Sequence, residues 1–108
     1  MTRTVVYMRG ASFVEVAATV GETIFEQDFE LGGIQRIQSR DFLIRTADLV
    51  LDAEQALPQA GDRVRETVSD KVFVYEVMAP GSVPPYRYSD PYRKALRIHT
   101  KHIATEDA

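Results

Sequence analysis

The sequence predicts an all-β protein, a small antiparallel β-barrel or sandwich of about seven strands. Two observations lead to this prediction. Short segments rich in β-branched and aromatic residues alternate apolar and polar positions with a period of two. Turn signals containing glycine, proline or a Ser-Asp pair separate these segments roughly every eight to twelve residues. The 108 residues suffice for a single β domain, which we expect to span 1–104, followed by a loose tail at 105–108.

The first half of the chain contains four candidate strands. They are RTVVYMR (3–9), SFVEVAATV (12–20), ETIFEQDFE (22–30) and IQRIQSRDFLIRT (34–46). A turn at Arg9–Ala11 joins the first two, and Gly21 is expected to interrupt the chain before the third. Gly32-Gly33 favours the next reversal, because glycine tolerates positive φ. The apolar phase of the fourth strand is imperfect, which predicts a bulge near Ser39.

The second half begins with a helical turn and ends with three candidate strands. The turn is expected near 46–52, with Thr46 as its cap and Asp48 in its first turn. The strands are RVRETV (63–68), KVFVYEVM (71–78) and RKALRIHTK (93–101). A tight turn at Ser69-Asp70 joins the first two, and the second is apolar on both faces, which predicts a central, buried strand. A long Pro/Gly-rich loop is expected at 79–92.

Composition excludes several classes of site. The chain has no cysteine, and so has neither a disulfide framework nor a Cys-based metal site. The apolar run near the N-terminus, Val5–Met8, is too short for a signal-peptide core or a bilayer span, so we expect no membrane partner. The net charge of −3 disfavours a general affinity for nucleic acid.

No pattern typical of an enzyme or a metal site is present. His99 and His102 are three residues apart, so on a strand they point to opposite faces, and there is no third histidine. His102 is in phase with Leu96 and Ile98, which predicts a histidine at the edge of the core. No G-x-S-x-G surrounds a serine, and no phosphate-binding glycine pattern accompanies Gly32-Gly33. We therefore predict a non-enzymatic protein with no cofactor and no metal.

Charge is distributed unevenly along the chain. Residues 15–30 contain five acids and no base, and Glu26, Asp28 and Glu30 form an acidic row on a predicted strand. Residues 86–101 contain five bases against the single Asp90. These regions are either two solvated faces or complementary surfaces, through which the acidic patch of one subunit meets the basic patch of the next.

The segment YRYSDPYRKALRIHTK (86–101) also concentrates tyrosines, and it has three interpretations. The tyrosines fold back over the protein's own core, form a protein interface, or stack on the bases of a single-stranded nucleic acid. In the last case Arg97, His99 and Lys101, on one strand face, would track phosphates. The candidate partner interface comprises Tyr86, Arg87, Tyr88, Tyr92, Arg93, Arg97, Glu26, Asp28 and Glu30.

The order of motifs between residues 34 and 103 resembles that of a known protein family. RDFLIRTADL is followed by a short spacer, by LPQAGDRVRE, by a turn and by VFVYEVMAP. A strand thus ends in an Arg-Thr-x-acid-aliphatic segment, and a Gly-Asp pair starts a two-stranded hairpin. This order resembles the head–tail joining (head-completion) proteins of tailed bacteriophages and prophages. The match is carried by Arg45, Thr46, Asp48, Leu49, Gly61 and Asp62.

The resemblance implies a non-enzymatic virion protein that joins the phage head, at its portal or adaptor, to the tail. It implies ring-forming self-association, residence in the virion and, during assembly, in the bacterial cytoplasm, with nucleic acid met only as a channel-lining contact. Family members often begin with a helix, whereas this chain opens on a strand, so a tail-terminator or other connector role stays open. The alternative is a small β-barrel that binds single-stranded nucleic acid.

Overall fold

The computed structural model describes residues 2–28, 32–80 and 83–108. Within these residues the chain forms nine β-strands and one short 3-10 turn, which confirms the all-β prediction. The elements are β1 (Thr2–Arg9), β2 (Ser12–Asp28), β3 (Ile34–Arg45), η1 (Thr46–Asp48), β4 (Val50–Leu51), β5 (Glu54–Gln55), β6 (Arg63–Val68), β7 (Lys71–Val77), β8 (Tyr86–Tyr88) and β9 (Ala95–Asp107).

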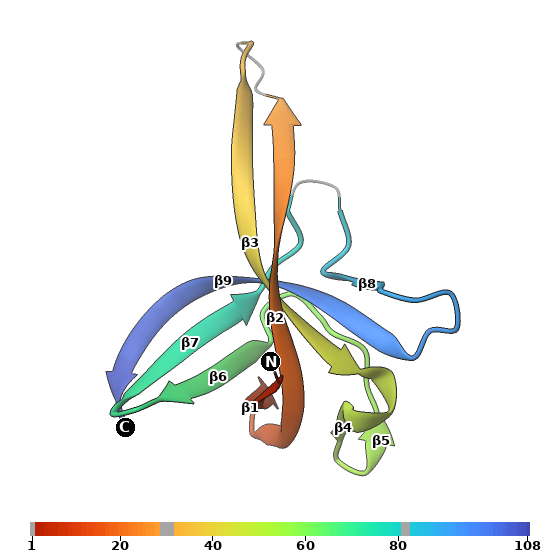
Figure 1. The fold of residues 1–108 in the computed structure, drawn as a ribbon, viewed down its shortest axis with the longest axis vertical. Helices are drawn as coiled ribbons and strands as arrows, with labels where there is room; N and C mark the ends of the chain where they lie inside the picture. The colour runs from red at the N-terminus through yellow and green to blue at the C-terminus, as the bar shows by residue number, and fades with distance from the viewer. Residues whose placement is uncertain (1, 29–31, 81–82) are drawn as a thin grey trace.

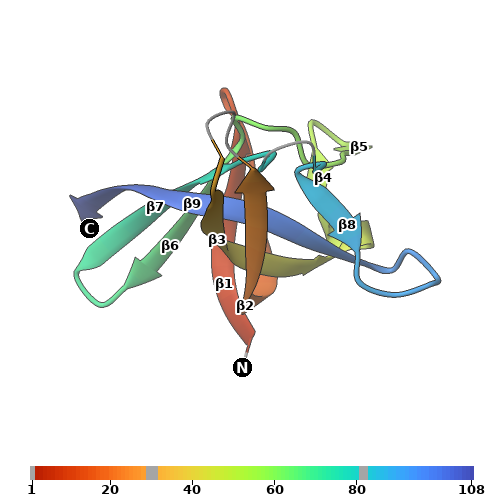
Figure 2. The same ribbon diagram turned by 90° about the horizontal axis from the view of Figure 1, so that it is seen from above.

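The main sheet closes into a small barrel. Seven strands follow the order β3-β2-β1-β6-β7-β9-β8, and β3 also pairs with β9. Strands β1, β2, β3, β9, β7 and β6 therefore form a ring in which each pairs with two neighbours, and β8 is attached to β9 outside that ring. In Figures 1 and 2, β9 crosses the molecule from one side to the other, pairing first with β3 and β8 and then with β7. Closure leaves few free sheet edges in the barrel.

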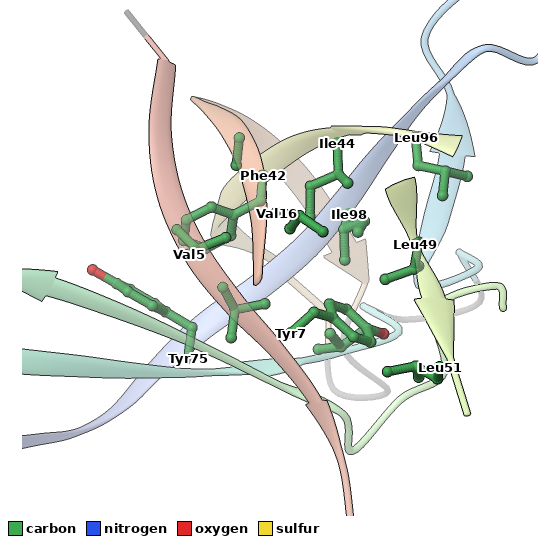
Figure 3. Close-up of a cluster of buried hydrophobic side chains, with 13 residues drawn as sticks. Val5, Tyr7, Val16, Phe42, Ile44, Leu49, Leu51, Tyr75, Leu96 and Ile98 are labelled. Carbon is green, nitrogen blue, oxygen red and sulfur yellow. The ribbon is translucent and has the colours of Figure 1, made fainter. Parts of the chain in front are cut away.

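The core fills the barrel and follows the period-two pattern of the sequence. Tyr7, Phe42 and Ile98 come from three different strands and are fully buried (Figure 3). The buried cluster consists of Val5, Tyr7, Val16, Ala18, Phe42, Ile44, Leu49, Leu51, Val64, Tyr75, Val77, Leu96 and Ile98. Each large apolar side chain removed from water contributes about 1.5–3 kcal/mol, so this cluster is the main stabilising element of the fold. The predicted central strand 71–78 is confirmed as β7, between β6 and β9.

Strands β2 and β3 continue beyond the barrel as a two-stranded arm. β2 pairs with β1 only over Ser12–Thr19, and β3 pairs with β9 only over Arg40–Arg45. The two strands pair with each other as far as Asp28 and Ile34. We define the arm as residues 22–28 and 34–39, and it stands clear of the other strands in Figure 1.

Two predictions about this region are wrong. β2 is not interrupted at Gly21, and the register of β2 with β3 is regular through the Thr23–Ser39 pair, without a bulge at Ser39. Gly21 serves another purpose, because a Cβ atom there would lie 2.9 Å from Nη2 of Arg97. The absence of a side chain makes room for the guanidinium of Arg97, which crosses over the strand.

The irregular pairing lies instead between β7 and β9. Val74 pairs with Ala104 and Tyr75 with His102, so Ile103 is an extra residue on β9. The predicted loose tail at 105–108 is also corrected, because β9 continues to Asp107 and pairs with the start of β7. The backbone N–H of Ala108 donates to the carbonyl of Asp70 at 2.9 Å. Backbone pairing with β7 thus orders a segment whose polar side chains gave no strand signal.

The segment after β3 agrees with its prediction in part. A helical turn is present as η1, but it is short, and its N-cap is Arg45. Thr46 does not cap it, because its hydroxyl donates to the carbonyl of Arg93 at 2.9 Å. The sequence also did not indicate the small β4–β5 hairpin, whose turn places Asp52 and Ala53 at positive φ. The predicted loop at 79–92 contains the short strand β8.

Candidate functional site

The tyrosine-rich and basic segment forms a hairpin of β8 and β9. Tyr86 and Tyr88 are half-buried and pack against the core, with their ring centroids 5.9 Å apart at an interplanar angle of 86°. This packing confirms the fold-back interpretation for these two residues. Tyr92, in contrast, is 79% exposed at the tip of the hairpin and is free to contact a partner.

Asp90 holds the hairpin loop in place. Its Oδ1 accepts hydrogen bonds from the backbone N–H groups of Lys94 and Ala95, both at 2.9 Å, and its Oδ2 accepts one from Tyr92 at 3.2 Å. The guanidinium of Arg93 lies 5.5 Å from the centre of the Tyr88 ring. Asp90 therefore orders the backbone of the loop, while Tyr92, Arg93 and Lys94 are exposed.

Arg97 does not lie with the exposed cations. Its Nε forms an ion pair with Asp41 Oδ2 at 2.7 Å, its Nη2 donates to the carbonyl of Glu22 at 2.9 Å, and the side chain is 20% exposed. His99, two residues on, is 1% exposed and also faces Asp41. The interpretation of Arg97 and His99 as a row that tracks phosphates is therefore wrong. Arg97 belongs to the interior of the region where β2, β3 and β9 meet.

Asp41 is the centre of a buried polar cluster. Its Oδ1 accepts a hydrogen bond from Ser39 at 2.5 Å and lies 2.9 Å from Nδ1 of His99, and its Oδ2 accepts from Thr23 and Arg97. Burial by itself raises the pKa of Asp41, but the hydrogen bonds from His99, Ser39, Thr23 and Arg97 outweigh it. The pKa of Asp41 is therefore held well below its usual range, and the carboxylate is charged.

A serine, a histidine and a carboxylate thus meet in one place, as they do in serine hydrolases, but the essential contact differs. Ser39 Oγ donates to Asp41, whereas a nucleophilic serine donates to a histidine nitrogen that takes its proton. Ser39 and His99 are each 1% exposed, and the Phe25 ring packs edge-on against His99 at 5.0 Å. The cluster joins β2, β3 and β9 at the place where β2 and β3 leave the barrel as the arm.

Two further acids are buried and paired with arginines. Asp62 accepts hydrogen bonds from the hydroxyl of Tyr7 and from Arg9 Nη2, the latter at 2.8 Å. Burial, together with the bond to Asp62, raises the pKa of the Tyr7 phenol above its usual range. Glu66 accepts from Arg3 at 2.8 Å and from Arg40 at 2.9 Å. A signal for Glu66 existed in the sequence, since it is in phase with the core residue Val64.

The acidic row predicted on the arm is flanked by a cation. Glu26 and Arg36 are opposite each other in the β2–β3 register, and Glu26 Oε1 lies 3.6 Å from Arg36 Nε, with both side chains exposed. The backbone of Asp28 pairs with that of Ile34, and Glu30 lies outside the described residues. Ile24 and Ile34 are 61% and 64% exposed, so the arm presents apolar as well as charged groups to solvent.

Two hollows lie beside the β8–β9 hairpin. One is a groove of about 590 Å³ between the β4–β5 hairpin and Tyr86. The other, about 370 Å³, is termed the basic pocket here and is lined by Arg45, Thr46, Ala47, Gln55, Arg93 and Lys94. Among the described residues, no three His, Asp or Glu side chains are grouped so as to hold a metal ion. Over the same residues, no helix is long and apolar enough to cross a bilayer.

Comparison with known proteins gives one result. A family model described as phage head-tail joining protein matches residues 1–107. No curated protein and no solved structure matches the chain. Several residues that carry the resemblance have definite positions in the fold. Leu49 is fully buried, Gly61 adopts a positive φ of 96° before β6, and Asp62 holds Tyr7 and Arg9.

Proposed function

Because the chain belongs to the phage head–tail joining protein family, we propose that it is a structural, non-enzymatic subunit that connects the portal or adaptor of the phage head to the tail. The match over residues 1–107 carries this proposal. A structural role is supported by the buried polar groups, because Asp41, Asp62 and Glu66 are each engaged by hydrogen bonds within the fold. Family membership also supports a place in the virion.

The tip of the β8–β9 hairpin is the surface that we assign to the portal-side or tail-side partner. Tyr92 is exposed there, and Arg87 and Arg93 have exposed side chains on the same hairpin. Tyrosine and arginine are enriched at the centres of protein interfaces. A loop whose backbone is ordered by Asp90 loses little conformational entropy on binding, which favours affinity.

The test is complementation of a phage or prophage that lacks the gene for this protein. We expect the Arg87→Glu/Arg93→Glu variant to fold, as judged by circular dichroism, and to leave heads without tails in electron micrographs, with a loss of infectious titre. The control, Arg63→Glu/Lys101→Glu, changes the charge equally at exposed positions on β6 and β9 and should restore the titre. A normal titre with the first variant would refute the interface, and tailed particles formed without the gene would refute the function.

A further inference from the structure

The formal charge of the chain is concentrated in one projecting element. The whole chain has 16 acids against 13 lysines and arginines, a net charge of −3. The arm, residues 22–28 and 34–39, has three acids and one base, a net charge of −2, so most of the excess negative charge of the chain lies in it. On the described part of the arm, Glu22 and Glu26 are exposed on the same face of β2, on either side of the exposed Ile24.

The basic pocket provides the opposite charge. Arg45 pairs with Ala95 across β3 and β9, and the N–H of Thr46 donates to the carbonyl of Lys94 at 2.8 Å. These contacts bring Arg45 beside Arg93 and Lys94, and no acid lines the pocket. Within the part of the chain that the structure describes, the side chains of Arg45 and Lys94 form no ion pair. Their charges are therefore available to a ligand.

The arm and the basic pocket lie at opposite ends of one strand. β3 begins in the arm at Ile34 and ends at Arg45, which lines the pocket. At about 3.3 Å per residue, the strand spans up to roughly 30 Å from Arg36, opposite Glu26, to Arg45, and up to roughly 17 Å from Arg40, opposite Glu22. Figures 1 and 2 show the arm leaving the barrel well away from the β8–β9 hairpin. The arm of one chain therefore does not reach the pocket of the same chain.

We propose that the acidic arm of one copy binds in the basic pocket of a second copy, with the carboxylates of Glu22 and Glu26 facing Arg45 and Lys94. This inference rests on the proposed function. Guanidinium groups bind carboxylates through paired, charge-assisted hydrogen bonds. Because the two surfaces differ, the contact is heterologous and repeats from copy to copy. A second copy fits the pocket better than nucleic acid does, because the protein itself carries the complementary charge.

The test uses two charge-reversed forms of the full chain in sedimentation velocity at low salt. The wild type should self-associate, and more weakly as salt is raised. Arg45→Glu/Lys94→Glu makes the pocket acidic, and Glu22→Lys/Glu26→Lys makes the arm basic, so each variant alone should associate at least tenfold more weakly. An equimolar mixture should associate again, because each arm then meets a pocket of opposite charge. The Arg63→Glu/Lys101→Glu variant, with the same charge change as the pocket variant, should behave as the wild type.

Three outcomes would overturn the proposal. They are a wild type that stays monomeric at every concentration, a mixture that does not associate, and a control that is weakened as much as the pocket variant. If the wild type is monomeric and binds a single-stranded oligonucleotide that the pocket variant does not bind, the pocket is assigned to phosphates instead. The function is tested separately by complementation. If the wild type is monomeric but its gene is still required for tailed particles, head–tail joining stands and only this contact is removed.

Discussion

At the scale of single residues, Asp41 is the group on which the junction of β2, β3 and β9 depends. Its carboxylate is fully buried and receives hydrogen bonds from side chains of all three strands. Asp41→Asn keeps the size of the side chain but leaves Arg97, itself 20% exposed, without its counter-charge. We expect the free energy of unfolding to fall by about 3 kcal/mol, measured by urea denaturation. Asp70→Asn, in the exposed turn before β7, should change it by less than about 0.5 kcal/mol, and an equally small effect at Asp41 would contradict this role.

The same carboxylate predicts how stability depends on pH. The pKa of Asp41 is lower in the folded protein than in the unfolded chain, so the unfolded chain binds the proton more readily. The stabilisation is therefore complete at neutral pH, and it is lost progressively as the pH falls below the ordinary aspartate pKa of about 3.9. Urea titrations between pH 7 and pH 3 should show this loss, and the Asp41→Asn variant should show less of it. Parallel curves for the two proteins would argue against Asp41 as the source.

At the scale of elements, the end of β9 makes a definite prediction. Thr105, Glu106 and Asp107 pair with the first three residues of β7. Removing residues 105–108 should lower the free energy of unfolding by about 2 kcal/mol, since two or three backbone hydrogen bonds of about 1 kcal/mol each are lost. Removal of Ala108 alone, which loses the single hydrogen bond from its N–H to the carbonyl of Asp70, should lower it by about 1 kcal/mol. An unchanged denaturation midpoint for the longer deletion would show that this part of β9 adds nothing to stability.

Local signals in the sequence predicted most of the strands. Segments 12–20 and 63–68 alternate clearly, and 3–9 and 71–78 are rich in β-branched and aromatic residues. Their turns are marked by Gly10 and by Ser69, which both adopt positive φ. The errors arose where a distant residue decides the structure. Gly21 resembles a break in the sequence, but it makes room for Arg97, which is 76 positions away. The end of β9 has no apolar pattern and is ordered through its pairing with β7.

The candidate site was predicted less well than the fold, for a related reason. Composition alone does not show whether a tyrosine or an arginine in the segment 86–101 serves the core or the surface. Tyr86 and Tyr88 pack against the core and Arg97 is paired with Asp41, whereas Tyr92 is exposed. Arg45 was assigned to a structural motif only, because its proximity to Lys94 depends on the pairing of β3 with β9. The pairing of the buried acids with arginines was not predicted, because these partners are remote in sequence.

At the scale of the whole molecule, the barrel and the arm should differ in stability. Amides of β3 and β9 inside the ring, such as those of Phe42, Ile44 and Ile98, lie in a closed sheet around the core. The arm is a two-stranded ribbon with exposed faces, and such ribbons open readily. Hydrogen exchange followed by NMR should therefore be slow at these three residues and much faster at Phe25 and Ile37. Equal protection in the two regions would show that the arm is stabilised as strongly as the barrel.

The continuity of β2 and β3 from the barrel into the arm has a mechanical consequence. A pull on the arm along its length acts parallel to these strands, and therefore across the hydrogen bonds that hold β2 to β1 and β3 to β9. Hydrogen bonds between strands that are pulled along their length share the tension and must break together. When the strands are instead pulled apart from one end, the bonds open one after another. The molecule is thus suited to transmit traction from its protruding ribbon to its body without coming apart.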